Sequence, residues 1–195
     1  MHPANRAFWS RCKTRYPQYF EGDISVLEVG SYDVNGSVRD YFNVAKYVGV
    51  DWREGPSVDI VCLAQNINLG IFNTVISASM LEHDPYWYQS IERMVENLDL
   101  DGILLLSWGA ALNQPHELHT APDHKFHNLP AGKVLNLLKE LEMTVSEFHY
   151  EGLLFPELTQ NTPNNGMGEV CLVAFDNPDL IQFTEIDELL PEDRI

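Results

Sequence analysis

Short apolar runs without strict polar alternation recur along the sequence, and they constrain the fold more than any other feature. Runs of this kind form strands that are covered on both faces, as in parallel sheets. Segments with helical periodicity separate most of them, which indicates a doubly wound α/β fold. The expected strands span residues 24–29, 47–51, 59–63, 74–79, 102–108, 143–150 and 169–175. A mostly parallel, seven-stranded sheet follows from this order.

The segments between the runs sharpen the topology. Residues 37–42 predict a short helix, and residues 134–141 predict an amphipathic one. Asp84 suits a helix N-cap and Pro85 suits the first helical position, and apolar residues then recur at helical spacing. No helical pattern separates the last two runs, so we expect them to form a hairpin that places an antiparallel strand at the C-terminal end of the sheet.

Two short connections complete this prediction. Asp101-Gly102 predicts a turn before the fifth run. Only residues 52–58 separate the second and third runs, fewer than the roughly dozen of a usual parallel crossover, so one helix should be missing there. No internal repeat or linker is evident. The expected organisation is a single domain over residues 1–175 with a helical lead-in at 1–23, followed by an acidic tail at 176–195.

The charge of the chain limits its partners. It carries 12 Lys and Arg against 29 Asp and Glu, a formal net charge of −17. Nucleic-acid binding depends on many Lys and Arg contacts with phosphates. The balance therefore argues against a nucleic-acid partner and weakly favours cationic ligands. Four basic residues near the N-terminus fit the solvated face of an amphipathic helix: Arg6, Arg11, Lys13 and Arg15.

Neither a membrane segment nor a secretion signal is predicted. The longest apolar stretches, such as residues 102–108, are far shorter than the ~20 residues that cross a bilayer. Residues 1–20 lack the apolar core of a signal peptide. Cys12, Cys62 and Cys171 are odd in number and form no Cys-x-x-Cys pair. We therefore expect a cytoplasmic protein with free, buried thiols and no membrane partner.

The first apolar run ends in a glycine loop, which is the strongest functional signal in the sequence. Ligands of open α/β sheets bind at the carboxyl ends of the strands. Gly30 directly follows such a strand and lets the backbone approach a ligand where a Cβ would collide. Glu28 is placed to accept a hydrogen bond from a ligand ammonium.

A second signal, Asp51-Trp52, follows the second run. An acid at this strand end can accept hydrogen bonds from both hydroxyls of a ribose, and an indole offers a flat apolar surface to adenine. Taken singly, Glu28, Gly30 and Asp51 are ordinary turn residues, but together they favour a nucleotide-like cofactor. A nicotinamide-binding domain would need Gly-x-Gly-x-x-Gly after the first strand, and that pattern is absent.

The sequence resembles class I S-adenosylmethionine-dependent methyltransferases over residues 24–175, especially small members whose methyl acceptor is uncharacterised. The resemblance depends on four segments: Leu-Glu-Val-Gly at 27–30, Val-Asn-Gly-Ser-Val-Arg at 34–39, Gly-Val-Asp-Trp-Arg-Glu-Gly-Pro at 49–56 and Met-Leu-Glu-His-Asp at 80–84. It implies a Rossmann-like sheet of seven strands with the last one antiparallel, and S-adenosylmethionine as cofactor. The cofactor-binding residues that it implies are Glu28, Gly30, Ser31, Tyr32, Gly36, Asp51, Trp52, Ala64, Gln65, Ser79 and Met80.

Histidines supply the candidate catalytic groups. Four of them follow the fifth run with the spacing H-x2-H-x4-H-x2-H: His116, His119, His124 and His127. This spacing is not that of a zinc helix, and we expect no metal. Imidazole titrates near neutral pH, so His83, His116 or His119 could act as a general base. The alternatives are that the loop histidines contact solvent or pack on a substrate loop, and that His83 orients the next helix.

We therefore expect methyl transfer to a small-molecule or sugar acceptor. An oxygen acceptor would suit a histidine base, and nitrogen or carbon acceptors stay open. The acceptor should bind between His83, the histidine loop and residues 153–155. The alternative is a non-catalytic binding or interaction module that keeps the fold. Tyr32, which replaces a glycine common in the family, and Leu63, which replaces an acid, would then be signs of decay. A homodimer is an open alternative to a monomer.

Overall fold

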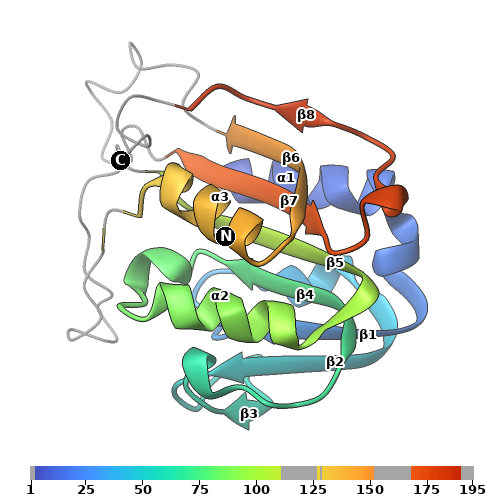
Figure 1. The fold of residues 1–195 in the computed structure, drawn as a ribbon. Helices are drawn as coiled ribbons and strands as arrows, with labels where there is room; N and C mark the ends of the chain where they lie inside the picture. The colour runs from blue at the N-terminus through green and yellow to red at the C-terminus, as the bar shows by residue number, and fades with distance from the viewer. Residues whose placement is uncertain (1–2, 111–126, 128, 152–167, 190–195) are drawn as a thin grey trace.

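A computed structural model describes residues 3–110, 127, 129–151 and 168–189. One sheet runs through this part of the chain, in the order β3-β2-β1-β4-β5-β7-β6-β8 (Figure 1). The strands are β1 (Glu21–Val29), β2 (Asn43–Asp51), β3 (Ile60–Val61), β4 (Phe72–Ala78), β5 (Leu98–Gly109), β6 (Thr144–Glu151), β7 (Glu169–Phe175) and β8 (Glu185–Ile186). The helices are α1 (Pro3–Arg15), α2 (Trp87–Glu96) and α3 (Ala131–Glu140).

The pairing confirms a doubly wound, mostly parallel sheet. Strand β1 lies between β2 and β4, and its Leu27 is in register with Val48 on one side and Val75 on the other. Strand β7 is antiparallel to both β5 and β6, so the predicted C-terminal hairpin is correct. Every residue of β7 is buried, as its continuous apolar sequence requires. This order brings the carboxyl ends of β1, β2, β4 and β5 to one edge.

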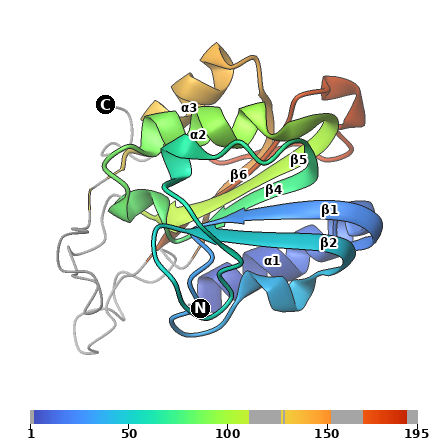
Figure 2. The same ribbon diagram turned by 90° about the horizontal axis from the view of Figure 1, so that it is seen from below.

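Helices cover both faces of the sheet (Figures 1 and 2). Successive residues of β5 point to opposite faces, because strand side chains alternate. Leu104 and Leu106 belong to a core that also contains apolar residues of α2 and α3. Ile103 and Leu105 belong to a second core with Phe8 and other residues of α1. Because β5 is buried on both faces, apolar side chains are needed at successive positions rather than at alternate ones, which explains its continuous apolar run.

Four local predictions differ from the structure. The described sheet has an eighth strand, because β8 pairs in parallel with β6. The segment expected to be a short helix at 37–42 is a 3₁₀ helix, Val38–Tyr41. Asp101-Gly102 lies inside β5, where residues 99–102 bulge between Leu98 and Ile103 in the pairing with β4. The expected N-cap Asp84 precedes the helix start, since α2 begins at Trp87 with Tyr86 as its N-cap.

Three of the four basic residues of α1 pair with acids rather than forming only a solvated face: Arg11, Lys13 and Arg15. Arg15 contacts Glu147 at 2.6 Å and Glu185 at 2.5 Å, and Arg11 contacts Glu151 at 2.5 Å. Burial alone would raise the pKa of Glu147, but contacts from His149, Tyr16 and Arg15 outweigh it and lower the pKa. These ion pairs join α1 to β6 and β8.

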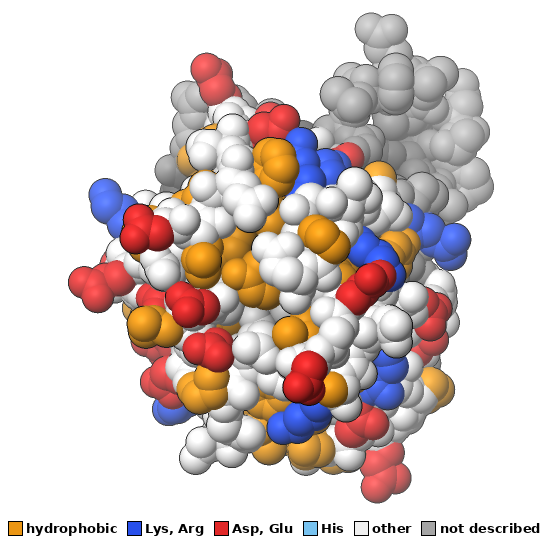
Figure 3. Space-filling model, turned by 90° about the vertical axis from the view of Figure 1, so that its right-hand side faces the viewer, with side chains coloured by type: hydrophobic (Ala, Val, Ile, Leu, Met, Phe, Trp, Pro, Cys, Tyr) orange, Lys and Arg blue, Asp and Glu red, His pale blue; other side chains and the backbone are white. Residues whose placement is uncertain are grey.

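The surface on the right-hand side of Figure 1 carries charges of both signs. Lys and Arg side chains are interspersed there with Asp and Glu, and hydrophobic atoms occur in small separate areas (Figure 3). No described helix is long and apolar enough to span a bilayer. The three cysteines are free thiols, and Cys12 and Cys171 are buried as expected, whereas Cys62 is partly exposed.

Candidate functional site

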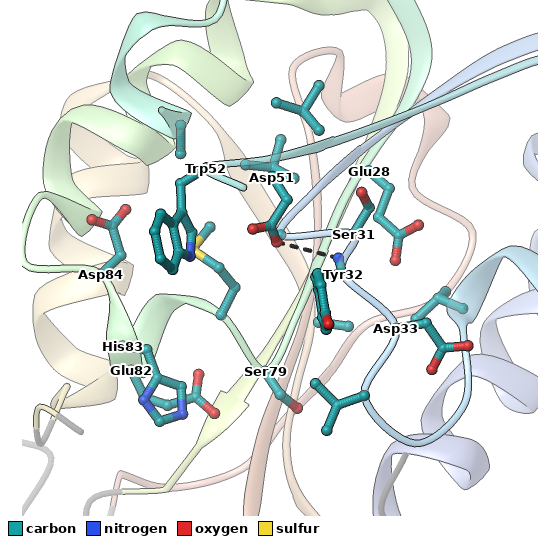
Figure 4. Close-up of a pocket in the computed structure, with 18 of the residues that line it drawn as sticks. Glu28, Ser31, Tyr32, Asp33, Asp51, Trp52, Ser79, Glu82, His83 and Asp84 are labelled. Carbon is teal, nitrogen blue, oxygen red and sulfur yellow. Dashed lines mark hydrogen bonds between the residues drawn. The ribbon is translucent and has the colours of Figure 1, made fainter. Parts of the chain in front are cut away.

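A cavity of about 540 Å³ opens at the carboxyl edge of the sheet (Figure 4). Loops that follow β1, β2, β3 and β4 surround it, together with the end of β5 and the start of β7, as expected for an open α/β sheet. The cavity contacts each of the eleven predicted cofactor-binding residues: Glu28, Gly30, Ser31, Tyr32, Gly36, Asp51, Trp52, Ala64, Gln65, Ser79 and Met80. His83 also lines it. Residues from four separate segments of the sequence thus meet at one site.

The loop after β1 is tied to the end of β2 by its backbone. The N–H groups of Gly30 and Ser31 both donate to the carbonyl oxygen of Val50, at 2.8 and 3.0 Å. Gly30 has φ +84°, a conformation that favours glycine. A Cβ at this position would lie 2.5 Å from Cβ of Met80, another residue of the cavity wall. The glycine is therefore required by a side chain of the wall, which the sequence did not indicate.

Asp51 ends β2 with its carboxylate at the cavity. Only 8% of the residue is exposed. Its two oxygens accept hydrogen bonds from the backbone N–H groups of Tyr32 (3.2 Å) and Arg53 (3.4 Å). Burial raises the pKa of Asp51, and these N–H groups oppose that rise. Each carboxylate oxygen has further acceptor capacity for a ligand hydroxyl.

Glu28 lies deeper and is already partnered. Tyr47 donates its hydroxyl to one carboxylate oxygen of Glu28 at 2.9 Å. Burial raises the pKa of Glu28 to about 8, and the hydrogen bond from Tyr47 only partly opposes this rise. Beside it, the Ser31 hydroxyl is buried at the cavity and has no hydrogen-bond partner among the described residues. A buried hydroxyl of this kind is available to a ligand.

Aromatic side chains line the cavity next to Asp51 (Figure 4). The Arg53 guanidinium lies 3.9 Å from the centroid of the Tyr32 ring and 5.3 Å from that of Trp52. Trp52 is 41% exposed, which leaves part of the indole accessible. Ala64 and Gln65 lie on a 3₁₀ helix, Ala64–Asn66, on the same wall.

The loop after β4 contains an unusual backbone conformation. Ser79 has φ +51°, which is uncommon for a residue with a side chain and is often found at functional sites. Its N–H donates to the carbonyl of Ser107 at 2.8 Å, and its hydroxyl accepts from the Asn5 amide at 2.8 Å. Asn5 of α1 therefore belongs to the cavity wall. Sequence reasoning missed it because α1 is distant in the chain and carries no motif.

Two buried acids, Glu82 and Glu169, were also missed. Each is 3% exposed and lines the cavity. Burial raises the pKa of Glu82 to about 7. Burial and the charge of Glu82 raise the pKa of Glu169 to about 8. A usable signal was the acid at the start of β7, a strand that is otherwise apolar and fully buried.

The structure describes two of the five histidines considered from the sequence, His83 and His127. His83 is buried at the cavity wall, and Asp84 orients the next helix by accepting from the N–H of Tyr86 and the hydroxyl of Ser90. His116, His119 and residues 153–155 lie outside the described residues, as does His124. His127 is exposed, and its backbone N–H donates to the Glu82 carbonyl at 2.5 Å.

Within the described ranges, three residues could converge on a metal ion: Glu147, His149 and Glu185. They lie on β6 and β8, and they do not line the cavity. Arg15 already pairs with both acids. This cluster is accounted for by the ion pairs that hold α1.

Comparisons with known proteins place this geometry in context. No family model and no curated protein matches the sequence. Among solved structures, a 1,6-didemethyltoxoflavin-N1-methyltransferase from Burkholderia thailandensis is 15% identical with a TM-score of 0.64, covering 88% of this chain and 77% of its own. The N-methyltransferase NodS from Bradyrhizobium japonicum, in complex with S-adenosyl-L-homocysteine, is 14% identical with a TM-score of 0.59, covering 91% and 89%. The chain has the class I methyltransferase fold.

This fold alone does not determine the reaction. The [4+2]-cyclase SpnF is also similar, with 14% identity, a TM-score of 0.60 and coverage of 85% and 80%. Function must therefore be argued from the cavity. Within the class I methyltransferase fold, the cavity occupies the switch-point edge, and its walls come from the same strand ends that the sequence motifs follow.

Proposed function

We propose that this chain binds S-adenosylmethionine in the cavity and transfers its methyl group to a small-molecule acceptor. One observation carries the proposal: the eleven cofactor-binding residues that the sequence resemblance implies converge on a single cavity. Its volume of about 540 Å³ is within the ~300–1,000 Å³ typical of small-molecule and cofactor sites. Two of the similar methyltransferases have S-adenosylhomocysteine bound, which supports the same choice.

The residues present fit this cofactor. Asp51 would accept hydrogen bonds from the ribose hydroxyls, using capacity beyond its two backbone donors. The accessible part of Trp52 would cover the adenine, with Ala64 and Gln65 beside it. The unpartnered hydroxyl of Ser31 is available to the amino-acid part of the cofactor.

The chemistry divides between cofactor and protein. When bound, the cofactor supplies a methyl group on a positively charged sulfur that can leave as a neutral thioether. The protein aligns the acceptor, excludes water and holds the proton that the acceptor loses. His83 is the predicted histidine base that lies at the described cavity wall.

A non-catalytic module is the second candidate. The similarity to a [4+2]-cyclase shows that this fold does not by itself imply methyl transfer, so binding and turnover have to be measured separately. Cofactor binding without turnover on any acceptor would be the outcome that selects it.

Isothermal titration calorimetry with S-adenosylhomocysteine tests the proposal, with NAD as a matched nucleotide control. We expect saturable binding of S-adenosylhomocysteine at micromolar concentrations and none of NAD. Binding of S-adenosylhomocysteine is expected from the geometry of Asp51 and Gly30. No binding of NAD is expected, because the sequence lacks the Gly-x-Gly-x-x-Gly fingerprint of dinucleotide-binding domains. Failure of folded protein to bind S-adenosylhomocysteine would overturn the assignment.

A further inference from the structure

Glu82 lies on the 3₁₀ helix Leu81–His83 after β4, Glu169 begins β7, and both are next to Gly109 at the end of β5. The Gly109 N–H donates to one carboxylate oxygen of Glu82 at 3.1 Å. Gly109 is also paired directly opposite Glu169 in the β5–β7 ladder. The two acids therefore both lie at the end of β5, close enough for the charge of Glu82 to act on Glu169. Glu82 and His83 are side by side on this part of the wall (Figure 4).

Each acid keeps one carboxylate oxygen that the described residues do not satisfy. The second carboxylate oxygen of Glu82 and one carboxylate oxygen of Glu169 are buried and lack a hydrogen-bond partner among the described residues. Such groups are costly and are normally paired. The contrast with Glu147 is direct, because that buried acid receives Arg15 and the Tyr16 hydroxyl. Both residues line the cavity, so a ligand bound there is placed to pair with these oxygens.

We infer that Glu82 and Glu169 form the acceptor subsite and that they select an acceptor with a protonatable primary or secondary amine. This inference rests on the proposed function, since it names the substrate class of the same site. An ammonium group supplies N–H donors for both open oxygens and a positive charge for the pair. A hydroxyl acceptor has one donor and no charge, so it would leave one of the acids unpaired.

The same pair can prepare the amine for reaction. An ammonium that enters the subsite transfers one proton to a carboxylate oxygen. The N–H bond breaks, an O–H bond forms, and the products are a neutral amine with a free electron pair and a neutral carboxylic acid. Because burial raises both pKa values toward neutrality, each acid is a stronger base than an exposed carboxylate.

A divalent cation is the main alternative ligand for two carboxylates. Such ions take six or more oxygen ligands, or several ligands plus water. Among the described residues, no third His, Cys, Asp or Glu forms with this pair a group whose ligand atoms all lie within 4.8 Å. The observations therefore favour an amine over a metal.

Matched amine and alcohol probes test the inference by calorimetry. The pairs are ethanolamine and ethylene glycol, benzylamine and benzyl alcohol, and tryptamine and tryptophol, titrated at pH 7.5 with EDTA, both with and without saturating S-adenosylhomocysteine. In at least one pair the amine should bind roughly tenfold or more tightly than its alcohol. Glu82→Gln and Glu169→Gln should each abolish that preference. Glu188→Gln removes the same charge from an exposed position outside the cavity and should keep it.

The outcomes separate this inference from the proposed function. Loss of S-adenosylhomocysteine binding alone would overturn the function, and the titrations without it would still report on the acids. Cofactor binding with no amine preference, or a preference that survives in folded Glu169→Gln, would overturn the inference. The inference also fails if the amine preference appears only when magnesium replaces EDTA, since a metal would then be responsible. It fails as well if the substitutions leave the amine titrations unchanged but weaken binding of S-adenosylmethionine more than that of S-adenosylhomocysteine, since the acids would then contact the cofactor's charge.

Discussion

The two halves of the cavity differ in how far the protein satisfies its own polar groups. On the half formed after β1 and β2, the carbonyl of Val50 receives two N–H groups, Asp51 receives two more, and Glu28 receives the Tyr47 hydroxyl. On the half formed after β4 and at β7, Glu82 and Glu169 each keep a buried oxygen without a partner among the described residues.

This difference indicates a division of labour. The acids of the first half are paired within the protein, and the Ser31 hydroxyl is left for a ligand, so this half suits a ligand that is the same in every turnover. The second half keeps charge that only a ligand can offset, at some cost in stability. Proteins tolerate such costs mainly at functional sites. Substitutions in the first half should weaken cofactor binding, and the free energy of unfolding should report the destabilisation caused by the second.

Gly30→Ala should have the largest effect. The new Cβ would collide with Met80 and would have to adopt a positive φ, so we expect cofactor affinity to fall by roughly a hundredfold or more, as for an overpacked site. Calorimetry with S-adenosylhomocysteine measures this loss. Gly22→Ala is the matched control, because Gly22 also has positive φ, +100°, but a Cβ there meets nothing within 4 Å. Equal affinities in the two variants would contradict the collision.

Asp51→Asn should have the next largest effect. Loss of charge-assisted hydrogen bonds to two hydroxyls should cost about 1.5–3 kcal/mol, roughly tenfold or more in affinity. Asp59→Asn serves as the control, since Asp59 accepts from the Gly49 N–H at 2.7 Å near the same edge but does not line the cavity. Unchanged affinity in folded Asp51→Asn would remove this acid from the ribose site.

The second half should show its cost as a pH dependence. The pKa of Glu169 is raised from 4.5 to about 8 on folding, so between these pH values the folded protein binds more protons than the unfolded chain. The free energy of unfolding therefore falls as pH rises through this window. Urea denaturation at pH 5 and pH 9 should show a loss of at least about 1 kcal/mol, and less in Glu169→Gln than in Glu188→Gln. The same pH dependence of the free energy of unfolding in both variants would show that ionised Glu169 does not destabilise the fold.

Tyr32→Gly should have the smallest effect of the four. Its ring lies under Arg53 and lines the cavity, so its removal should admit water and weaken S-adenosylhomocysteine by about threefold to tenfold. Tyr32→Phe retains the ring and should bind almost as the natural chain does. Tighter binding by Tyr32→Gly would show instead that the ring obstructs the site.

The sequence was sufficient for the parallel sheet and for the first half of the cavity. Both depend on local patterns, namely continuous apolar runs and polar residues at the strand ends. Of the second half, Ser79, Met80 and His83 were predicted. The pair of acids was not, because Glu82 and Glu169 are 87 positions apart and come together only through the β5–β7 pairing. Asn5 was missed for the same reason, since α1 reaches Ser79 across 74 positions.

Short-range signals also failed where tertiary contacts override them. Asp101-Gly102 is a good turn sequence, yet the ladder continues past it as a bulge. Asp84 is a good cap, yet it holds the helix from two residues before the N-cap, through Tyr86 and Ser90. In both cases the residue keeps its local preference while the element around it begins or ends elsewhere.

The attachment of α1 has a consequence for synthesis on the ribosome. Arg15 and Tyr16 find their partner Glu147 only 132 and 131 positions later, and Phe8 and Trp9 pack into a core that includes β5 and β7. At roughly 5–20 residues per second, this helix waits on the order of ten seconds before β6 emerges. Its aromatic face is exposed to other chains and to chaperones throughout that interval. Crowded translation should therefore endanger this protein through its earliest helix, which waits much longer for its partners than β1 waits for β2.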